Sequence, residues 1–423
     1  MIENQKIILL FFFIPLPILL MNLEGFFFFK ENVNFFKERL QVKEIFLKKE
    51  APLFQEKKKE REEIITEIEG IIPKIENTLI KVQKFVERIE KERIQKIKEK
   101  SENIQGVYIT SFTASSNQVY AQKLRNNILK LSEEKKINSV VIDVKEAKGS
   151  QLSSQLKKKI LEFHQKNLWV IARIVIFRDS SLKDDQPELY LKSKSGGFWQ
   201  DNQRCYWLDP ASQEVQDYII SFSKKVIDYG FDELQFDYIR FPSDGSLKDI
   251  VYPFYDEKKE RIEAISNFAE RLNSELRDYK KEIVLSVDIF GYLATQFEGK
   301  GIGQKLKDFK DFDYISFMLY PSHFYGGFEE FPYESEDIIE VASSHPYEVV
   351  FRSIQRASDY LEPLGGIAKI RPWLQAFNLK ADTKRGIFYD AEKITAQINA
   401  AQTANSSGFL LWDPENKYTF FNE

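Results

Sequence analysis

Residues 233–242 read ELQFDYIRFP, and this stretch carries the pattern that decides the fold. Apolar and aromatic residues alternate with polar ones, as is typical of a β-strand, and Asp237 and Arg240 stand toward its carboxyl end. An amphipathic segment of helix length precedes the stretch at 213–229, and another follows at 257–279. This alternation of strand and helix predicts a parallel sheet.

Seven further runs of the same kind lie along the chain. They are GVYITSF (106–112), SVVIDVK (139–145), WVIARIVIF (169–177), VLSVDIFGY (284–292), YISFMLYPSH (314–323), IRPWLQAF (370–377) and GFLLWDP (408–414), with further amphipathic segments at 121–134 and 391–404. Eight such strands predict a closed (β/α)8 barrel, a TIM barrel. An open doubly wound sheet is the alternative. It is disfavoured because no glycine-rich turn follows the first run and because polar residues collect at the carboxyl ends of the runs.

The composition of the 423-residue chain excludes several classes of protein. Hydrophobic residues make up 43% and aromatic residues 14%, which is enough for a sizeable core. The 61 basic and 65 acidic residues nearly cancel, so we expect no nucleic-acid partner. A single cysteine and three histidines argue against a zinc site and against redox chemistry, and no metal or cofactor is expected.

The N-terminal region predicts attachment to a membrane. Residues 7–23 (IILLFFFIPLPILLMNL) are nearly all apolar, which is the length of a signal-peptide core and just short of an ordinary spanning helix. No cleavage site of small residues follows, so an uncleaved anchor is favoured over a removed signal. Pro15 and Pro17 argue against a buried helix of a cytosolic protein. We expect residues 1–29 to hold an extracytoplasmic protein at the membrane, or to direct its secretion.

Residues 30–103 form a second, charge-dense region with apolar residues at helical spacing. The pattern predicts long helices that break near Gly70 and Pro73. Such a stalk would act as a spacer or as a coiled coil for self-association, or it would pack on the main domain as a hairpin. No sustained heptad decides between these. The barrel is then expected at 104–423.

Two aspartates stand near the carboxyl ends of neighbouring runs. Side chains two positions apart share a face of a strand, so Gln235 points the same way as Asp237, and Ser286 the same way as Asp288. Both aspartates are then expected to point into the barrel mouth. Neighbouring strands lie about 4.8 Å apart, so the carboxylates can approach the roughly 5 Å separation of a retaining glycosidase pair. Asp237, kept ionised by a cation, would attack the anomeric carbon. Asp288, with its pKa raised by apolar neighbours, would protonate the leaving oxygen.

Other polar and aromatic residues converge on the same rim. Arg173 and Arg240 are the cations available to Asp237, and Asp143 would orient a sugar hydroxyl. Each residue alone could be a salt bridge that ends a strand, but their convergence favours a site. The expected substrate-binding residues are Asp143, Lys145, Arg173, Trp207, Asp209, Arg240, Tyr320, His323, Gln375, Trp412 and Asp413.

Aromatic side chains in these loops suit the apolar faces of sugar rings. Trp199 and Trp207 follow the third run in a long loop, and they are the favoured platforms for a sugar. For Trp373 and Trp412, which alternate with inward positions, core filling is nearly as good an interpretation.

Nine motifs give the chain a resemblance to a known family. They are GVYITSFTA, VVIDVKEAKG, ARIVIFRD, WLDPASQEVQDYI, FDELQFDYIRFPSDG, LSVDIFGY, YISFMLYPSHF, RPWLQAF and GFLLWDPENKY, and together they span 106–418. The chain resembles the bacterial glycoside hydrolase-like domain family that was first catalogued as a domain of unknown function. The resemblance implies a barrel distantly similar to the α-amylase clan, with the nucleophile on the fourth strand and the acid on the fifth. These roles fall on Asp237 and Asp288, the latter in place of the clan's usual glutamate.

The sequence therefore predicts a glycoside hydrolase that acts on a carbohydrate polymer outside the cytoplasmic membrane. Two alternatives stay open. The barrel could bind carbohydrate or organise the envelope without turnover, or it could transfer glycosyl groups in the same groove. A metal-dependent deacetylase is disfavoured by the shortage of histidines.

Overall fold

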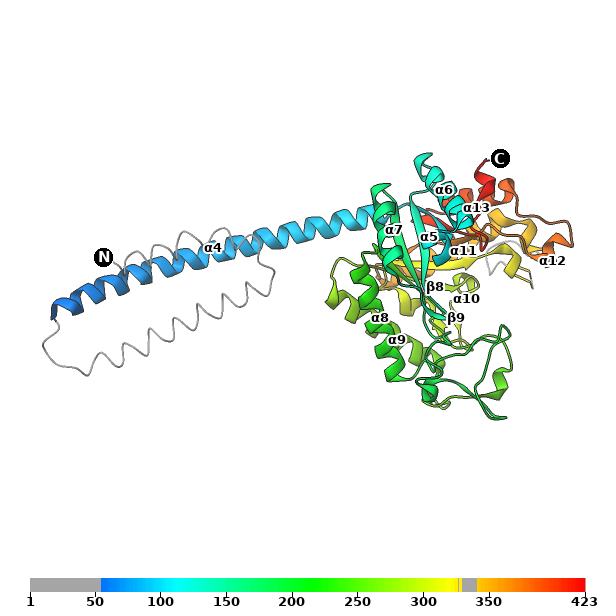
Figure 1. Cartoon of the computed structure of the whole chain (residues 1–423), viewed down its shortest axis with the longest axis horizontal. Coiled ribbons are helices and arrows are strands. Elements are labelled where there is room, and N and C mark those ends of the chain that lie inside the picture. The colour runs from blue at the N-terminus through cyan, green and yellow to red at the C-terminus, as the bar shows by residue number, and fades with distance from the viewer. Residues whose placement is uncertain (1–54, 326, 329–340, 423) are drawn as a thin grey trace. The chain divides into compact units, whose positions relative to one another are not determined.

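The computed structural model describes residues 55–325, 327–328 and 341–422 (Figure 1). The expected anchor at 1–29 lies outside them. The chain divides into two compact units, one up to Arg88 and one from Ile89 onward. Among the described helices, none combines the length and apolar content that crossing a membrane requires.

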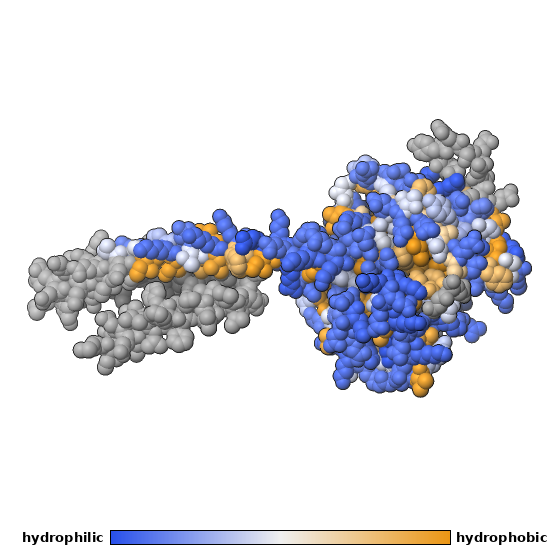
Figure 2. All heavy atoms as spheres, turned by 90° about the horizontal axis from the view of Figure 1, so that it is seen from above, coloured by the Kyte–Doolittle hydropathy of each residue, from blue (hydrophilic) through white to orange (hydrophobic). Residues whose placement is uncertain are grey.

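One helix, α4 (Gln55–Ser101), occupies the described part of the charge-dense region, for which several helices were expected. The predicted break near Gly70 and Pro73 is wrong, because the helix continues through both residues. A proline inside a helix removes one hydrogen bond at a cost of about 3 kcal/mol. Helix propagation is cooperative, so the turns on either side of Pro73 can carry the helix across that defect. Apolar residues gather along one side of α4 (Figure 2), and Ile80 and Phe85 are both 51% exposed.

Eight parallel strands of the second unit form a closed barrel, counted over the described residues. They are β1 (Ile104–Ile109), β2 (Ser139–Glu146), β4 (Trp169–Val175), β6 (Glu233–Asp237), β8 (Val284–Phe290), β11 (Tyr314–Leu319), β13 (Trp373–Gln375) and β14 (Gly408–Trp412). Each pairs with the next, and β1 pairs with both β2 and β14, which closes the ring. The predicted (β/α)8 barrel is confirmed, and the open sheet is excluded.

Helices cover the outside of the barrel between successive strands (Figure 1). They are α6 (Val119–Glu133), α7 (Ser154–Gln165), α8 (Gln213–Tyr229), α9 (Arg261–Tyr279), α11 (Pro346–Leu361) and α13 (Ala391–Thr403), with the shorter α5 (Ser111–Ser115), α10 (Leu293–Gln296) and α12 (Lys380–Thr383). Ser153 and Ser212 cap α7 and α8 by accepting backbone N–H bonds. Gly230, at φ +98°, ends α8 in the left-handed conformation that glycine adopts without strain.

Among the described residues, six short strands lie outside the eight barrel strands, and four of them form two separate two-stranded sheets, β5 with β7 and β9 with β10. They are β3 (Gly149–Ser150), β5 (Lys192–Ser193), β7 (Ile250–Val251), β9 (Glu298–Gly299), β10 (Gln304–Lys305) and β12 (Lys369–Ile370). The seventh predicted run is divided into β12 and β13 at Arg371 and Pro372. A proline has no N–H to donate to a ladder, which accounts for the interruption.

The barrel interior holds a buried polar layer at the amino-terminal ends of the strands. Glu233 and Arg371 are both fully buried and form an ion pair. Ser286 donates to the Glu233 carboxylate at 2.6 Å, and Trp169 donates to it at 3.0 Å. These buried side chains fill this end of the barrel. The opposite end is free to form a site.

Candidate active site

A cleft of about 590 Å³ opens at the carboxyl ends of the barrel strands. Seven of the residues expected in the site line it, namely Arg173, Asp237, Arg240, Asp288, Tyr320, His323 and Trp412. The strands position them because side chains at the ends of parallel strands meet at one rim. The structure thus brings together both candidate catalytic aspartates and five of the expected binding residues.

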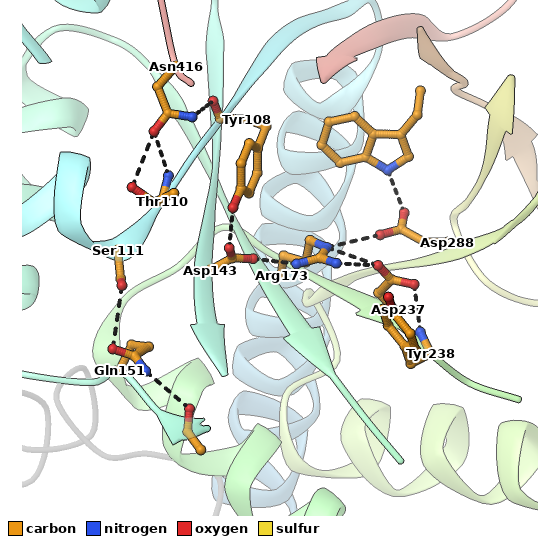
Figure 3. A network of polar contacts seen from close by, with 12 residues as sticks. Tyr108, Thr110, Ser111, Asp143, Gln151, Arg173, Asp237, Tyr238, Asp288 and Asn416 are labelled. Atoms are coloured by element: carbon orange, nitrogen blue, oxygen red, sulfur yellow. Dashed lines mark hydrogen bonds and ion pairs between the residues drawn. The ribbon is translucent and has the colours of Figure 1, made fainter. Parts of the chain in front are cut away.

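Arg173, in β4, is the electrostatic centre of this site (Figure 3). Its Nε donates to Asp237 Oδ2 at 3.0 Å and lies 3.8 Å from Asp288 Oδ2, while Nη1 contacts Asp143 Oδ1 at 2.5 Å. The register explains this convergence, because β4 lies between β2 and β6 in the barrel. One guanidinium therefore faces three carboxyl groups, and its charge cannot compensate three anions.

The environments of Asp237 and Asp288 differ in burial and in hydrogen-bond partners. Burial raises the pKa of Asp288 well above its usual range, and the nearby charge of Asp237 raises it further. The Trp373 indole donates to Asp288 Oδ1 at 2.7 Å and opposes this rise only in part. Asp237, by contrast, takes two hydrogen bonds from Arg173. Asp237 therefore has a cation as its hydrogen-bond donor, whereas Asp288 is buried and has a raised pKa.

The two carboxyl groups are close enough to act on one bond. Arg173 Nε contacts an oxygen of each, at 3.0 and 3.8 Å, so those oxygens are no farther apart than these two distances placed end to end. This limit applies to that pair of oxygens, and it is compatible with the roughly 5 Å separation of the carboxyl groups in retaining pairs.

The backbone bends sharply at the end of β6. Tyr238 has a φ of +57°, which is uncommon for a residue with a side chain, and its N–H donates to Asp237 Oδ1 at 2.6 Å. Such backbone strain is found at functional sites, where the surrounding structure holds it in place. The bend also ends the strand earlier than predicted, so that both Asp237 and Arg240 line the cleft.

Asp143 has a different role from the one expected. It is 1% exposed and does not line the cleft, so its carboxylate holds Arg173 and does not orient a sugar hydroxyl. The Tyr108 hydroxyl donates to its other oxygen, and the Tyr108 ring stacks on Trp412 with centroids 3.9 Å apart. Tyr108 was missed from the sequence, although its place in the first run gave it an inward position. Nearby, burial and the Asp143 charge raise the pKa of Glu146 to about 7.

Three expected binding residues are held in structural networks away from the cleft. Lys145 is fully buried, ion-paired with Asp179 at 2.7 Å and bonded to the Val175 carbonyl oxygen. Asp209 accepts three backbone N–H bonds, and Asp413 likewise accepts backbone N–H bonds in its own loop. Because their hydrogen bonds and ion pairs hold the surrounding backbone in place, these three residues are structural. The prediction that they bind substrate is wrong.

The aromatic predictions are also partly reversed. Trp199 and Trp207 are only 3% and 1% exposed, so neither offers a face to a sugar. Trp412 is partly exposed and lines the cleft. Trp373 also borders the cleft but is only 1% exposed, as its interpretation as core filling expected. Gln375 is fully buried, where it bonds Ser322 and does not reach the cleft. The loop after the third strand folds on itself, which no spacing in the sequence revealed.

A closed (β/α)8 barrel with carboxyl groups and aromatic rings in a cleft at the carboxyl ends of its strands defines a barrel of the glycoside hydrolase type. The chain belongs to the family described as "Putative glycosyl hydrolase domain", whose sequence profile matches residues 106–418. The resemblance drawn from the nine motifs is confirmed.

Solved structures of similar fold include one from Bordetella bronchiseptica, the PgaB (BpsB) glycoside hydrolase domain. It is 13% identical with a TM-score of 0.52, over 75% of this chain and 96% of that one. A hypothetical protein from Ruminiclostridium thermocellum is 32% identical with a TM-score of 0.36, over 43% of this chain and 96% of that one. The spore cortex-lytic enzyme SleL of Bacillus cereus is 12% identical with a TM-score of 0.45, over 76% and 74%. No curated protein matches the chain.

Proposed function

We propose that the cleft hydrolyses glycosidic bonds of a polysaccharide by two-carboxylate catalysis, with Asp237 as nucleophile and Asp288 as acid and base. The observation that carries the proposal is the position of Arg173, which ion-pairs with Asp237 and leaves Asp288 buried beside it. Membership of a glycosyl hydrolase family supports the reaction class.

The first step divides the work between the two aspartates. An oxygen of Asp237 forms a bond to the anomeric carbon as the bond from that carbon to the leaving oxygen breaks. The proton of Asp288 passes to the leaving oxygen, which departs as a sugar hydroxyl. Arg173 already stabilises charge beside the reacting groups, so little reorganisation is needed as the glycosyl ester forms.

The second step reverses these roles. Asp288, now a carboxylate, takes a proton from a water whose oxygen attacks the anomeric carbon. The bond to Asp237 breaks, and both aspartates return to their starting forms. The anomeric configuration is retained because the carbon is attacked twice from opposite faces. If a sugar hydroxyl takes the place of water, the same chemistry transfers the glycosyl group.

Aromatic side chains give the cleft the surface that a sugar chain needs. Trp412 and Tyr292 are partly exposed in the cleft, and Tyr325 is 74% exposed at its edge. Sugar rings stack on such faces through their C–H groups, while the polar groups between them bond the hydroxyls. This lining supports a carbohydrate over a purely apolar substrate.

The test is release of reducing ends from a panel of envelope and storage polysaccharides. We expect the unmodified chain to release them from at least one polymer and Asp237→Asn to lose about a thousandfold or more of that activity. The matched control is Asp311→Asn, which makes the same change at an exposed ion pair away from the cleft and is expected to retain activity. Binding of a polymer without release by any variant would instead support the carbohydrate-binding alternative.

We further propose that residues 1–29 anchor the protein outside the cytoplasmic membrane and that the stalk permits self-association. The apolar run at 7–23 supports the first, and the apolar residues of α4 support the second. Fractionation of cells tests the anchor, since an anchored chain stays with the membranes in alkaline carbonate. Sedimentation of the chain with and without residues 1–88 tests self-association.

A further inference from the structure

Arg240 lines the cleft beside the proposed catalytic aspartates, in an aromatic setting. The residue is 7% exposed. Its guanidinium carbon lies 5.2 Å from the ring centroid of Trp207, 4.8 Å from that of Tyr238 and 4.7 Å from that of Phe290. These rings fix the guanidinium in place and remove most of its water.

Most hydrogen-bond donors of Arg240 have no partner among the described residues. A guanidinium carries five N–H donors. Arg240 Nη1 donates to the Phe241 carbonyl oxygen at 3.0 Å, and within the described residues its nitrogens form no other hydrogen bond and no ion pair. Burial lowers the pKa of Arg240, but a guanidinium stays charged at neutral pH. Cation–π contacts offset only part of the cost of burying such a charge.

Other arginines that are buried as deeply show what is missing at Arg240. Arg173 ion-pairs with Asp143 and Asp237, and Arg371 ion-pairs with Glu233. Arg125, which is also buried as deeply, donates to the backbone carbonyl oxygens of Thr113, Ala114 and Ser116. In each of these cases, groups of the protein itself compensate the buried charge. At Arg240, the open cleft lies where the other buried arginines have these protein groups.

We propose that Arg240 binds a carboxylate of the substrate, so that the cleft takes an acidic polysaccharide built with sugar acids. The inference rests on the proposed glycosidase function of this cleft. A carboxylate matches the planar fork of one guanidinium through two parallel hydrogen bonds. A phosphate would call for more positive charge, and among the described lining residues there is no lysine to supply it. The neighbouring Asp237 is ion-paired with Arg173, which offsets part of its repulsion of the incoming anion.

Matched polymers separate this inference from a purely structural role of Arg240. Polygalacturonate, alginate and hyaluronan are each compared with their carboxyl-reduced, neutral derivatives. Two properties are measured on the full chain, namely the dissociation constant by calorimetry and the kcat/KM for reducing-end release. A carboxylate contact makes the acidic form of a polymer bind more tightly than its neutral form, and the Arg240 variants show whether Arg240 makes that contact.

The variants are chosen to keep the fold. Arg240→Met keeps the length of the side chain and its contact with the rings, while Arg240→Lys keeps the charge without the fork. The matched control is Arg261→Met, since Arg261 also lies over two rings, those of Phe241 and Tyr252, but does not line the cleft. Thermal midpoints verify that each variant is folded.

We expect the unmodified chain to bind at least one acidic polymer more tightly than its neutral form. The dissociation constants should differ roughly 10- to 100-fold, which is the effect on binding that hydrogen bonds to a charged group typically have. Arg240→Met should lose this preference, Arg240→Lys should keep part of it, and Arg261→Met should keep all of it. Equal binding of acidic and neutral forms by the unmodified chain, or an unchanged preference in Arg240→Met, overturns the inference. Binding with the expected preference but without release overturns the hydrolase and leaves the carboxylate site standing.

Discussion

The hydrogen bond from Trp373 to Asp288 gives the most specific prediction for the proposed acid. Trp373 Nε1 donates to Asp288 Oδ1 at 2.7 Å, and this contact stabilises the carboxylate form, which lowers the pKa of Asp288. Trp373→Phe removes the donor and keeps an aromatic ring. The pKa of Asp288 should then rise further above its usual range.

The size of the shift follows from the strength of the bond. A hydrogen bond to a charged group contributes about 1.5–3 kcal/mol, and one pKa unit corresponds to about 1.4 kcal/mol. The loss of the Trp373 donor should therefore raise the pKa of Asp288 by about 1–2 units. Because the acid must be protonated to act, activity falls as the pH rises through this pKa. The basic limb of the profile should move upward by the same amount.

The assay is the pH dependence of kcat/KM on the polymer identified by the panel. The matched control is Trp169→Phe, which removes an indole donor from the buried carboxylate of Glu233 at the opposite end of the barrel. Its basic limb should stay within about 0.3 units of that of the unmodified chain. A limb that does not move in Trp373→Phe, or that moves to lower pH, would refute Asp288 as the acid.

Three predictions concern stability. Lys145→Met leaves Asp179 buried without its partner and should lower the free energy of unfolding by about 3–5 kcal/mol in a urea titration, whereas a change below 1 kcal/mol would mean that the pair is not formed. Gly408→Ala should lower the free energy of unfolding by at least about 2 kcal/mol, because φ at this position is +83° and the added Cβ would meet the Ile104 backbone where β14 pairs with β1. An unchanged thermal midpoint would contradict this closure of the barrel. The hydrogen bond to Asp232 raises the pKa of His164 against the effect of burial, so the pair stabilises the fold below the unfolded pKa of about 6.5, and this stabilisation is lost as the pH rises through the folded pKa. His164→Asn should therefore lower the thermal midpoint more at pH 5 than at pH 9, and an equal loss at both would show that the charge is not involved.

The barrel could be predicted because its signals are local. Alternation within runs such as 139–145 and 284–292 matches β2 and β8 closely, and the amphipathic segment at 213–229 coincides with α8. The inward direction of Asp237 and Asp288 follows from the same alternation. These features depend on neighbours in sequence, so one chain suffices to find them.

The choice of partners could not be predicted, because it depends on distances between strands. The sequence offered Arg173 and Arg240 equally as the cation for Asp237, and only the barrel register places Arg173 there. The left-handed turn at Tyr238, a tyrosine with no turn signal of its own, redirects Arg240. Lys145 looked like a rim residue because its partner Asp179 lies in a loop thirty-odd positions away.

The most direct test of the central claim is to trap the glycosyl group on Asp237. In Asp288→Asn, an activated aryl glycoside of the released sugar still forms the intermediate, because its leaving group needs no proton, while hydrolysis lacks its base. Mass spectrometry of digested protein should then find one sugar residue bound to the peptide that contains Asp237. A label on a different carboxylate, or turnover with no label and an inverted anomeric product, would contradict the account.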